Sequence, residues 1–114
     1  QKMRKRKIYI AGPMTGIERW NRPAFGQAAR TLRAQGWEVV SPVEVGDAFG
    51  SPNTIVTTPG LLDTVIDEEL AQLATCDAIY LLRGWQDSRG TRTELYLALE
   101  KGLDIIIEEV KVKA

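Results

Sequence analysis

Histidine is absent from the 114-residue sequence, and cysteine occurs once, at Cys76. Without histidine, a single chain can have neither Ser-His-Asp nor Cys-His catalysis, and no histidine-ligated zinc site. A single cysteine excludes an internal disulfide, which fits a reducing, cytoplasmic location. Any acid–base chemistry must therefore be carried mostly by carboxylates. We expect neither a metal nor another cofactor, because nothing in the sequence indicates one.

The sequence also lacks long apolar runs and net charge. No run approaches the roughly 18 residues that cross a bilayer, and no signal-peptide pattern follows the basic start, so we expect no membrane segment. Lys plus Arg and Asp plus Glu number 15 each, a balance that argues against a dedicated nucleic-acid binder. The basic cluster 4–7 is the exception. We read 1–6 as a flexible solubilising arm, with DNA contact as the alternative, on a single domain spanning 1–114.

Short apolar runs alternate with stretches of helical spacing. Four runs predict strands, at residues 8–11, 37–40, 77–82 and 104–107. Three stretches predict helices, at residues 21–36, 61–75 and 91–102. Residues 43–60 have little periodicity and predict a long surface loop, of the kind that serves as a lid or binding loop. The alternation predicts an α/β fold: a three-layer, Rossmann- or flavodoxin-like parallel sheet of four to five strands flanked by helices.

A glycine-bearing loop follows the first predicted strand, where ligands bind in parallel sheets. Its sequence is Gly12-Pro13-Met14-Thr15-Gly16. Glycine lets the backbone approach a ligand, and free N–H groups there can accept an anion. The glycine spacing and lysine of a P-loop are missing. A simple turn therefore remains the alternative.

A second such loop follows the third predicted strand. Ser88 and Gly90 precede the expected helix start at Thr91, whose N–H groups and partial positive charge suit a phosphate or carboxylate. Thr91-x-x-Glu94 is typical of a capping box, which the local pattern favours. In the alternative, Glu94 is a carboxylate aimed into the cleft and kept ionised by the helix N-terminus. Trp85 either stacks on a base or packs in the core.

Acidic residues gather on the second predicted helix. Asp63 and Asp67 are four residues apart and share a face, and a carboxylate from this helix could act as a general acid. Glu68 and Glu69 follow directly, and we interpret them as partly solvated surface. Asn21 precedes the first predicted helix and is read as its N-cap, with a ligand hydrogen bond as the alternative.

These separate features stand in a familiar order. The motifs are Tyr9-Ile10-Ala11-Gly12-Pro13-Met14-Thr15-Gly16, Asn21, Phe25, Cys76-Asp77-Ala78-Ile79-Tyr80-Leu81-Leu82, Gly84-Trp85, Ser88, Gly90 and Glu94. Over residues 7–107 they resemble a family of small phage and bacterial proteins that looks like a compact branch of the nucleoside 2-deoxyribosyltransferase superfamily.

The resemblance implies an activity on a nucleoside or nucleoside 5′-monophosphate. The glutamate at Glu94 would attack C1′ of the (deoxy)ribose and form a covalent glycosyl-enzyme, which water or a second base then resolves. The family normally has an aspartate that assists base departure where this chain has Glu69, and Asp67 or Asp63 is the alternative acid.

The resemblance also implies how the substrate binds. Ser88 would contact the 5′-phosphate or 5′-hydroxyl, and residues 12–16 would line the sugar and phosphate. Tyr9, Asn21, Trp85 and Gly90 complete the expected substrate-binding set, in a homodimer or higher homo-oligomer. A non-catalytic nucleotide-binding or regulatory module of prophage origin is the competing hypothesis, because Glu69 replaces the usual aspartate.

Overall fold

Four short strands form one parallel sheet in the computed structural model, which describes residues 4–109. The strands are β1 (Lys7–Ala11), β2 (Glu38–Val40), β3 (Ala78–Leu81) and β4 (Asp104–Ile107). Their order across the sheet is β2-β1-β3-β4, and every neighbouring pair is parallel. The predicted α/β fold with a Rossmann-like parallel sheet is therefore confirmed, with four strands.

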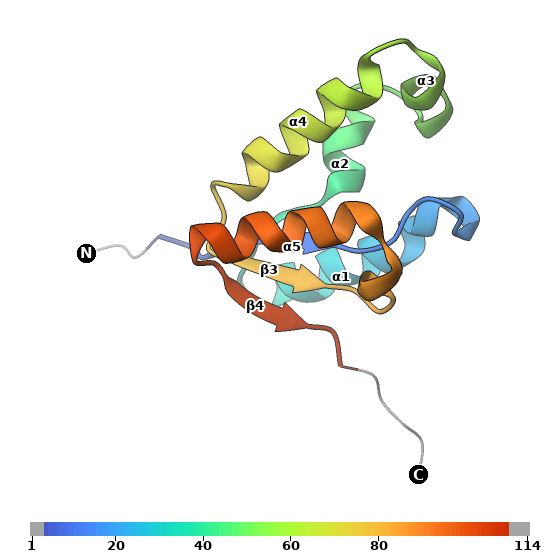
Figure 1. The fold of residues 1–114 in the computed structure, drawn as a ribbon. Helices are drawn as coiled ribbons and strands as arrows, with labels where there is room; N and C mark the ends of the chain where they lie inside the picture. The colour runs from blue at the N-terminus through green and yellow to red at the C-terminus, as the bar shows by residue number, and fades with distance from the viewer. Residues whose placement is uncertain (1–3, 110–114) are drawn as a thin grey trace.

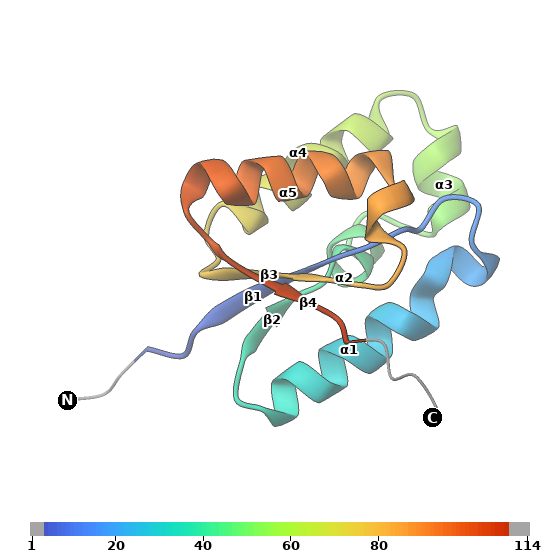
Figure 2. The same cartoon turned by 60° about the horizontal axis from the view of Figure 1, so that its bottom comes forward.

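Helices cover both faces of this sheet (Figures 1 and 2). The long helices are α1 (Arg22–Ala34), α4 (Leu61–Leu73) and α5 (Arg89–Lys101). Figure 2 shows α1 on one side of the strands and α4 with α5 on the other. No helix within residues 4–109 combines the length and the apolar character needed to cross a bilayer.

Strand β1 is buried on both faces, which explains its unbroken apolar sequence. Alternate side chains of a strand point to opposite faces. Ile8 and Ile10 accordingly pack in the cluster that contains Phe25 of α1. Tyr9 and Ala11 pack in the other cluster, beneath α4 and α5. Tyr9 thereby comes to lie under the helices that carry the acidic residues.

The predicted long loop after β2 is wrong, because two short helices occupy most of it. These are α2 (Pro42–Asp47) and α3 (Pro52–Thr57), and both begin with a Ser-Pro pair that suits an N-cap and first helical position. The Ser51 hydroxyl accepts a hydrogen bond from the Thr54 N–H at 3.2 Å. Buried Ile55 anchors α3 beside α4. Helices of six residues are too short to show a 3.6-residue period.

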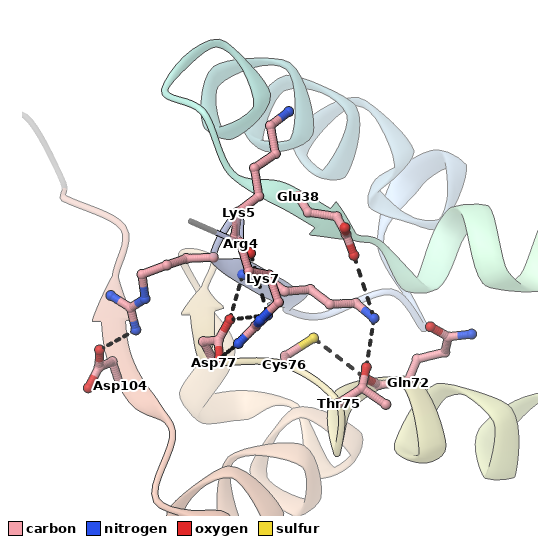
Figure 3. A network of polar contacts seen from close by, with 10 residues as sticks. Arg4, Lys5, Lys7, Glu38, Gln72, Thr75, Cys76, Asp77 and Asp104 are labelled. Atoms are coloured by element: carbon pink, nitrogen blue, oxygen red, sulfur yellow. Dashed lines mark hydrogen bonds and ion pairs between the residues drawn. The ribbon is translucent and has the colours of Figure 1, made fainter. Parts of the chain in front are cut away.

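Ion pairs cluster at the amino ends of the strands (Figure 3). Arg4 donates two hydrogen bonds to Asp77, at 3.1 and 2.9 Å, and the Lys7 N–H donates a third at 2.8 Å. The Arg4 guanidinium, with the Lys7 N–H, holds the pKa of Asp77 below its usual range. Arg6 pairs with Asp104 at 2.6 Å. These contacts link the start of the chain to the amino ends of the strands, opposite the cavity described below. Residues 1–3 of the expected arm lie outside the described residues.

Candidate functional site

A cavity of about 930 Å³ opens at the carboxyl ends of β1 and β3. This volume is near the upper end of the roughly 300–1,000 Å³ that small-molecule sites occupy. Three segments form its walls: the loop after β1, one face of α4, and the loop after β3 with the first turns of α5. The sequence-predicted residues that line it are Gly12, Pro13, Met14, Thr15, Asn21, Glu69, Ser88, Gly90 and Glu94.

Glu94 lies one turn inside α5, and its carboxylate accepts a hydrogen bond from the hydroxyl of Tyr9 on β1. Tyr9 is fully buried. Burial raises the pKa of Glu94 to about 8; the Tyr9 hydrogen bond opposes that rise and the charge of Glu69 adds to it. Burial also raises the pKa of Tyr9 well above its usual value, so the phenol stays a proton donor. The arrangement joins a buried donor to a carboxyl group that faces the cavity.

The capping-box interpretation of Glu94 is wrong. Helix α5 begins at Arg89, and Ser88 is its N-cap. The Ser88 hydroxyl oxygen accepts hydrogen bonds from the N–H of Thr91 at 3.2 Å and from its hydroxyl at 2.9 Å. Thr91 is buried, which fixes this start of the helix. Glu94 is therefore not in the first turn, and the expectation that the helix N-terminus keeps it ionised is also wrong, since burial dominates its pKa.

Glu69 on α4 faces the same cavity as Glu94. The Glu69 side chain is partly exposed, as its interpretation as partly solvated surface predicts, and burial raises its pKa to about 7. Asp67, two residues earlier, is exposed and lies outside the cavity lining. Two carboxyl groups thus line one partly desolvated space, and burial raises the pKa of both toward or above neutral pH.

The loop after β1 runs close to the end of β3. A Cβ atom on Gly12 would lie 2.7 Å from Cβ of Leu82, so glycine is needed for this approach. Asn21 does not cap α1 with its side chain. Its amide instead donates a hydrogen bond to the Pro13 carbonyl at 2.9 Å, which closes the loop on itself. Asn21 does take the N-cap position of α1, but the interpretation that its side chain caps the helix is wrong.

Three successive residues near the end of this loop, Arg19, Trp20 and Asn21, have left-handed backbone conformations, with φ of 54°, 56° and 59°. Such a run costs roughly 1–2 kcal/mol per residue, so the surrounding contacts must hold it in place.

The remaining predicted residues lie outside the cavity lining. Tyr9 reaches the site only through Glu94, and Gly16 lies at the exposed tip of the loop. Trp85 packs against the apolar cluster beneath α5, as its core interpretation predicts. The cavity also contains residues that the sequence did not single out, notably Arg83, Arg89 and Ile66. Ile66 could have been found, because it lies one helical turn before Glu69.

Two arginines and one aspartate, Asp87, lie at the α5 end of the cavity, so their formal charges sum to a net positive charge. Arg83 and Arg89 both line it, and neither guanidinium pairs with a carboxylate within the described part of the chain. The N-terminus of α5 adds unpaired N–H groups at the same end. This end can hold an anion. Among residues 4–109, no group of three or more Cys, Asp or Glu side chains is placed to hold a metal ion.

Comparisons with known proteins place this geometry in context. The solved structure of a 2-deoxyribosyltransferase from Bacillus psychrosaccharolyticus has the same fold, with a TM-score of 0.66 and 22% sequence identity. The match covers 92% of this chain and 77% of that enzyme. No curated protein sequence matches the chain. A family-wide sequence profile matches residues 6–107. The chain therefore belongs to the family described as Domain of unknown function (DUF4406).

Proposed function

We propose that this protein cleaves or transfers at the N-glycosidic bond of a nucleoside or nucleoside 5′-monophosphate through a covalent glycosyl–Glu94 intermediate. The observation that carries the proposal is the Glu94 carboxyl, which lines the cavity and accepts the hydrogen bond of buried Tyr9. The shared fold with a 2-deoxyribosyltransferase supports it.

In the first half-reaction, a carboxylate oxygen of Glu94 bonds to C1′ while the bond from C1′ to the base breaks. The departing base takes a proton from Glu69, which lines the same cavity. In the second half-reaction, water or an acceptor base attacks C1′ and gives its proton to Glu69, and Glu94 leaves as a carboxylate. Two displacements of this kind retain the configuration at C1′ and pass through oxocarbenium-like transition states.

This chemistry requires an ionised Glu94 and a protonated Glu69. Their pKa values, about 8 and about 7, favour the opposite distribution in the free protein. Treated as independent groups, the pair is in the reactive state in roughly 5% of molecules near the midpoint. The pH profile of kcat/KM is then bell-shaped, with its maximum between these pKa values.

The anionic end of the substrate fits the other end of the cavity. Arg83, Arg89 and the N-terminus of α5 present positive charge and N–H groups there. A 5′-phosphate at this position would satisfy N–H groups that the helix leaves unpaired. The sugar would then lie between Ser88 and Glu94.

We also propose that the chain assembles into a homo-oligomer. Tyr96 and Leu99 on α5 are 66% and 60% exposed, and Ile107 on the edge strand β4 is 54% exposed. Exposed apolar side chains of this size favour burial against another protein. Sedimentation of the wild type and of Leu99→Arg tests this: the wild type should sediment as a multimer and the variant as a smaller species, and a monomeric wild type would contradict it.

The direct test is base release. The protein is incubated with a panel of nucleosides and nucleoside 5′-monophosphates, and free base is measured by chromatography. We expect release by the wild type and a loss of at least about a thousandfold in Glu94→Gln, as for removal of a nucleophile. Glu100→Gln is the matched control, because Glu100 is exposed on the same helix. Release that Glu94→Gln leaves undiminished would refute the mechanism. Tight binding of a nucleotide recovered intact would support a non-catalytic binding module instead.

A further inference from the structure

A second, smaller cavity of about 110 Å³ adjoins the first. The two share Met14, Thr15 and Glu69 as lining residues, so Glu69 faces both spaces. The other walls of the small cavity come mainly from α4 and from α2 and α3, the two short helices that the sequence did not reveal. Glu94 lines only the large cavity.

The walls of the small cavity are mostly apolar. They include Ile55 and Val56 of α3, Leu62 and Val65 of α4, and Trp20 from the left-handed turn. An apolar cavity of roughly 150 Å³ admits one benzene ring. The small cavity, at about 110 Å³, is smaller than this, so a single six-membered ring would nearly fill it and reach its opening, and a fused two-ring system would extend much further into the large cavity.

Displacement at C1′ fixes where the base must lie. The nucleophile approaches from one side, and the leaving group departs on the other. With the sugar at Glu94 in the large cavity, departure toward Glu69 leads to the small cavity, because Glu69 lines both. The acid that protonates the base then stands at the entrance of the space that receives it.

We propose that the small cavity is the base subsite and that its size selects a pyrimidine over a purine. This inference rests on the proposed function. Besides Thr15 and Glu69, the polar lining consists of Asp47 and Arg22, and the Asp47 carboxylate accepts two hydrogen bonds from Arg22 at 3.1 and 2.8 Å. Each of its oxygens keeps a free lone pair for an N–H group of the base. A small number of placed polar groups in a mostly apolar pocket is the usual means of orienting a ligand.

The test uses the Glu94→Gln protein, in which turnover is blocked, and calorimetric titration with thymidine, deoxycytidine, deoxyadenosine and deoxyguanosine. We expect the pyrimidine nucleosides to bind at least about tenfold more tightly than the purine nucleosides, since a misfitting ring leaves the apolar pocket unfilled. Adding Val56→Trp, which fills the small cavity from an exposed position, should weaken pyrimidine binding about tenfold or more. Thr57→Trp is the matched control, because Thr57 is exposed on the same helix and outside the lining, and it should leave binding unchanged.

The outcomes separate this inference from the proposed function. Equal or tighter purine binding, or pyrimidine binding that Val56→Trp leaves intact, would overturn the base subsite even if the wild type releases base. Failure of every nucleoside to bind, together with no base release by the wild type, would overturn the proposed function and the inference with it. Circular dichroism checks folding, and Leu62→Trp replaces Val56→Trp if that variant does not fold.

Discussion

The hydrogen bond from Tyr9 to Glu94 can be removed with little change in shape by Tyr9→Phe. The phenol stabilises the ionised form of Glu94, so it lowers a pKa that burial raises to about 8. Without the donor, the carboxylate keeps its desolvation cost and loses its partner. We therefore expect the pKa of Glu94 to rise further and the population of the ionised nucleophile to fall.

The size of this effect follows from the type of bond. A hydrogen bond to a charged group contributes roughly 1.5–3 kcal/mol, and one pKa unit corresponds to about 1.4 kcal/mol. The pKa of Glu94 should rise by about 1–2, which lowers the ionised fraction about 10- to 100-fold at any pH below both pKa values. Above the original pKa the wild type is already ionised, so the loss should shrink as pH increases.

The assay is the pH profile of kcat/KM for base release, measured from about pH 6 to about pH 9.5. Tyr80→Phe is the matched control, because Tyr80 lies on β3 and packs in the cluster on the α1 face. In Tyr9→Phe only, we expect a loss that is constant on the acid side of the maximum and shrinks above about pH 8, which moves the basic limb to higher pH. A uniform loss at every pH would mean that Tyr9 acts only in packing, and an unchanged profile would refute the electrostatic reasoning.

Three further outcomes are expected. Because folding raises the pKa of Glu94, this group stabilises the fold fully below its unfolded pKa, and the stabilisation is lost as pH rises through about 8. Thermal melts should therefore show that Glu94→Gln raises Tm at about pH 8.5 and not at about pH 4. An equal effect on Tm at both pH values would contradict this. Ser88→Ala removes the N-cap hydroxyl of α5 and should lower the free energy of unfolding by about 1 kcal/mol in urea titrations. An unchanged urea midpoint would contradict this role of Ser88. Gly12→Ala places a Cβ 2.7 Å from a Leu82 carbon and should lower the free energy of unfolding by about 1–3 kcal/mol in the same titrations. Gly90→Ala places its Cβ within 4 Å of no atom and should lower it by less. Equal losses in the two variants would refute the close-approach argument.

The sheet could be predicted from sequence because its strands are covered on both faces and therefore read as short apolar runs. Helices α2 and α3 could not, since each has six residues and is held by burial of residues such as Pro42 and Ile55 rather than by its own periodicity. Many residues that line the small cavity come from α2 and α3, so sequence patterns could not predict this cavity either.

The candidate site shows the same division. The loops after β1 and β3 could be placed at one edge because parallel strands end together. The start of α5 could not be fixed, since Ser88 and Thr91 both suit an N-cap and only the burial of Thr91 decides between them. The contact between Tyr9 and Glu94 joins residues 85 apart in the chain, and no local pattern encodes it.

The central claim is that Glu94 becomes covalently bonded to the sugar. The most direct measurement is mass spectrometry of the protein after incubation with a 2-deoxy-2-fluoro nucleoside, whose fluorine slows breakdown of the glycosyl-enzyme. The account predicts a mass increase equal to the sugar, located on Glu94 after proteolysis, with release of an equal amount of base. Base release without any adduct, or an adduct on another residue that persists in Glu94→Gln, would contradict it.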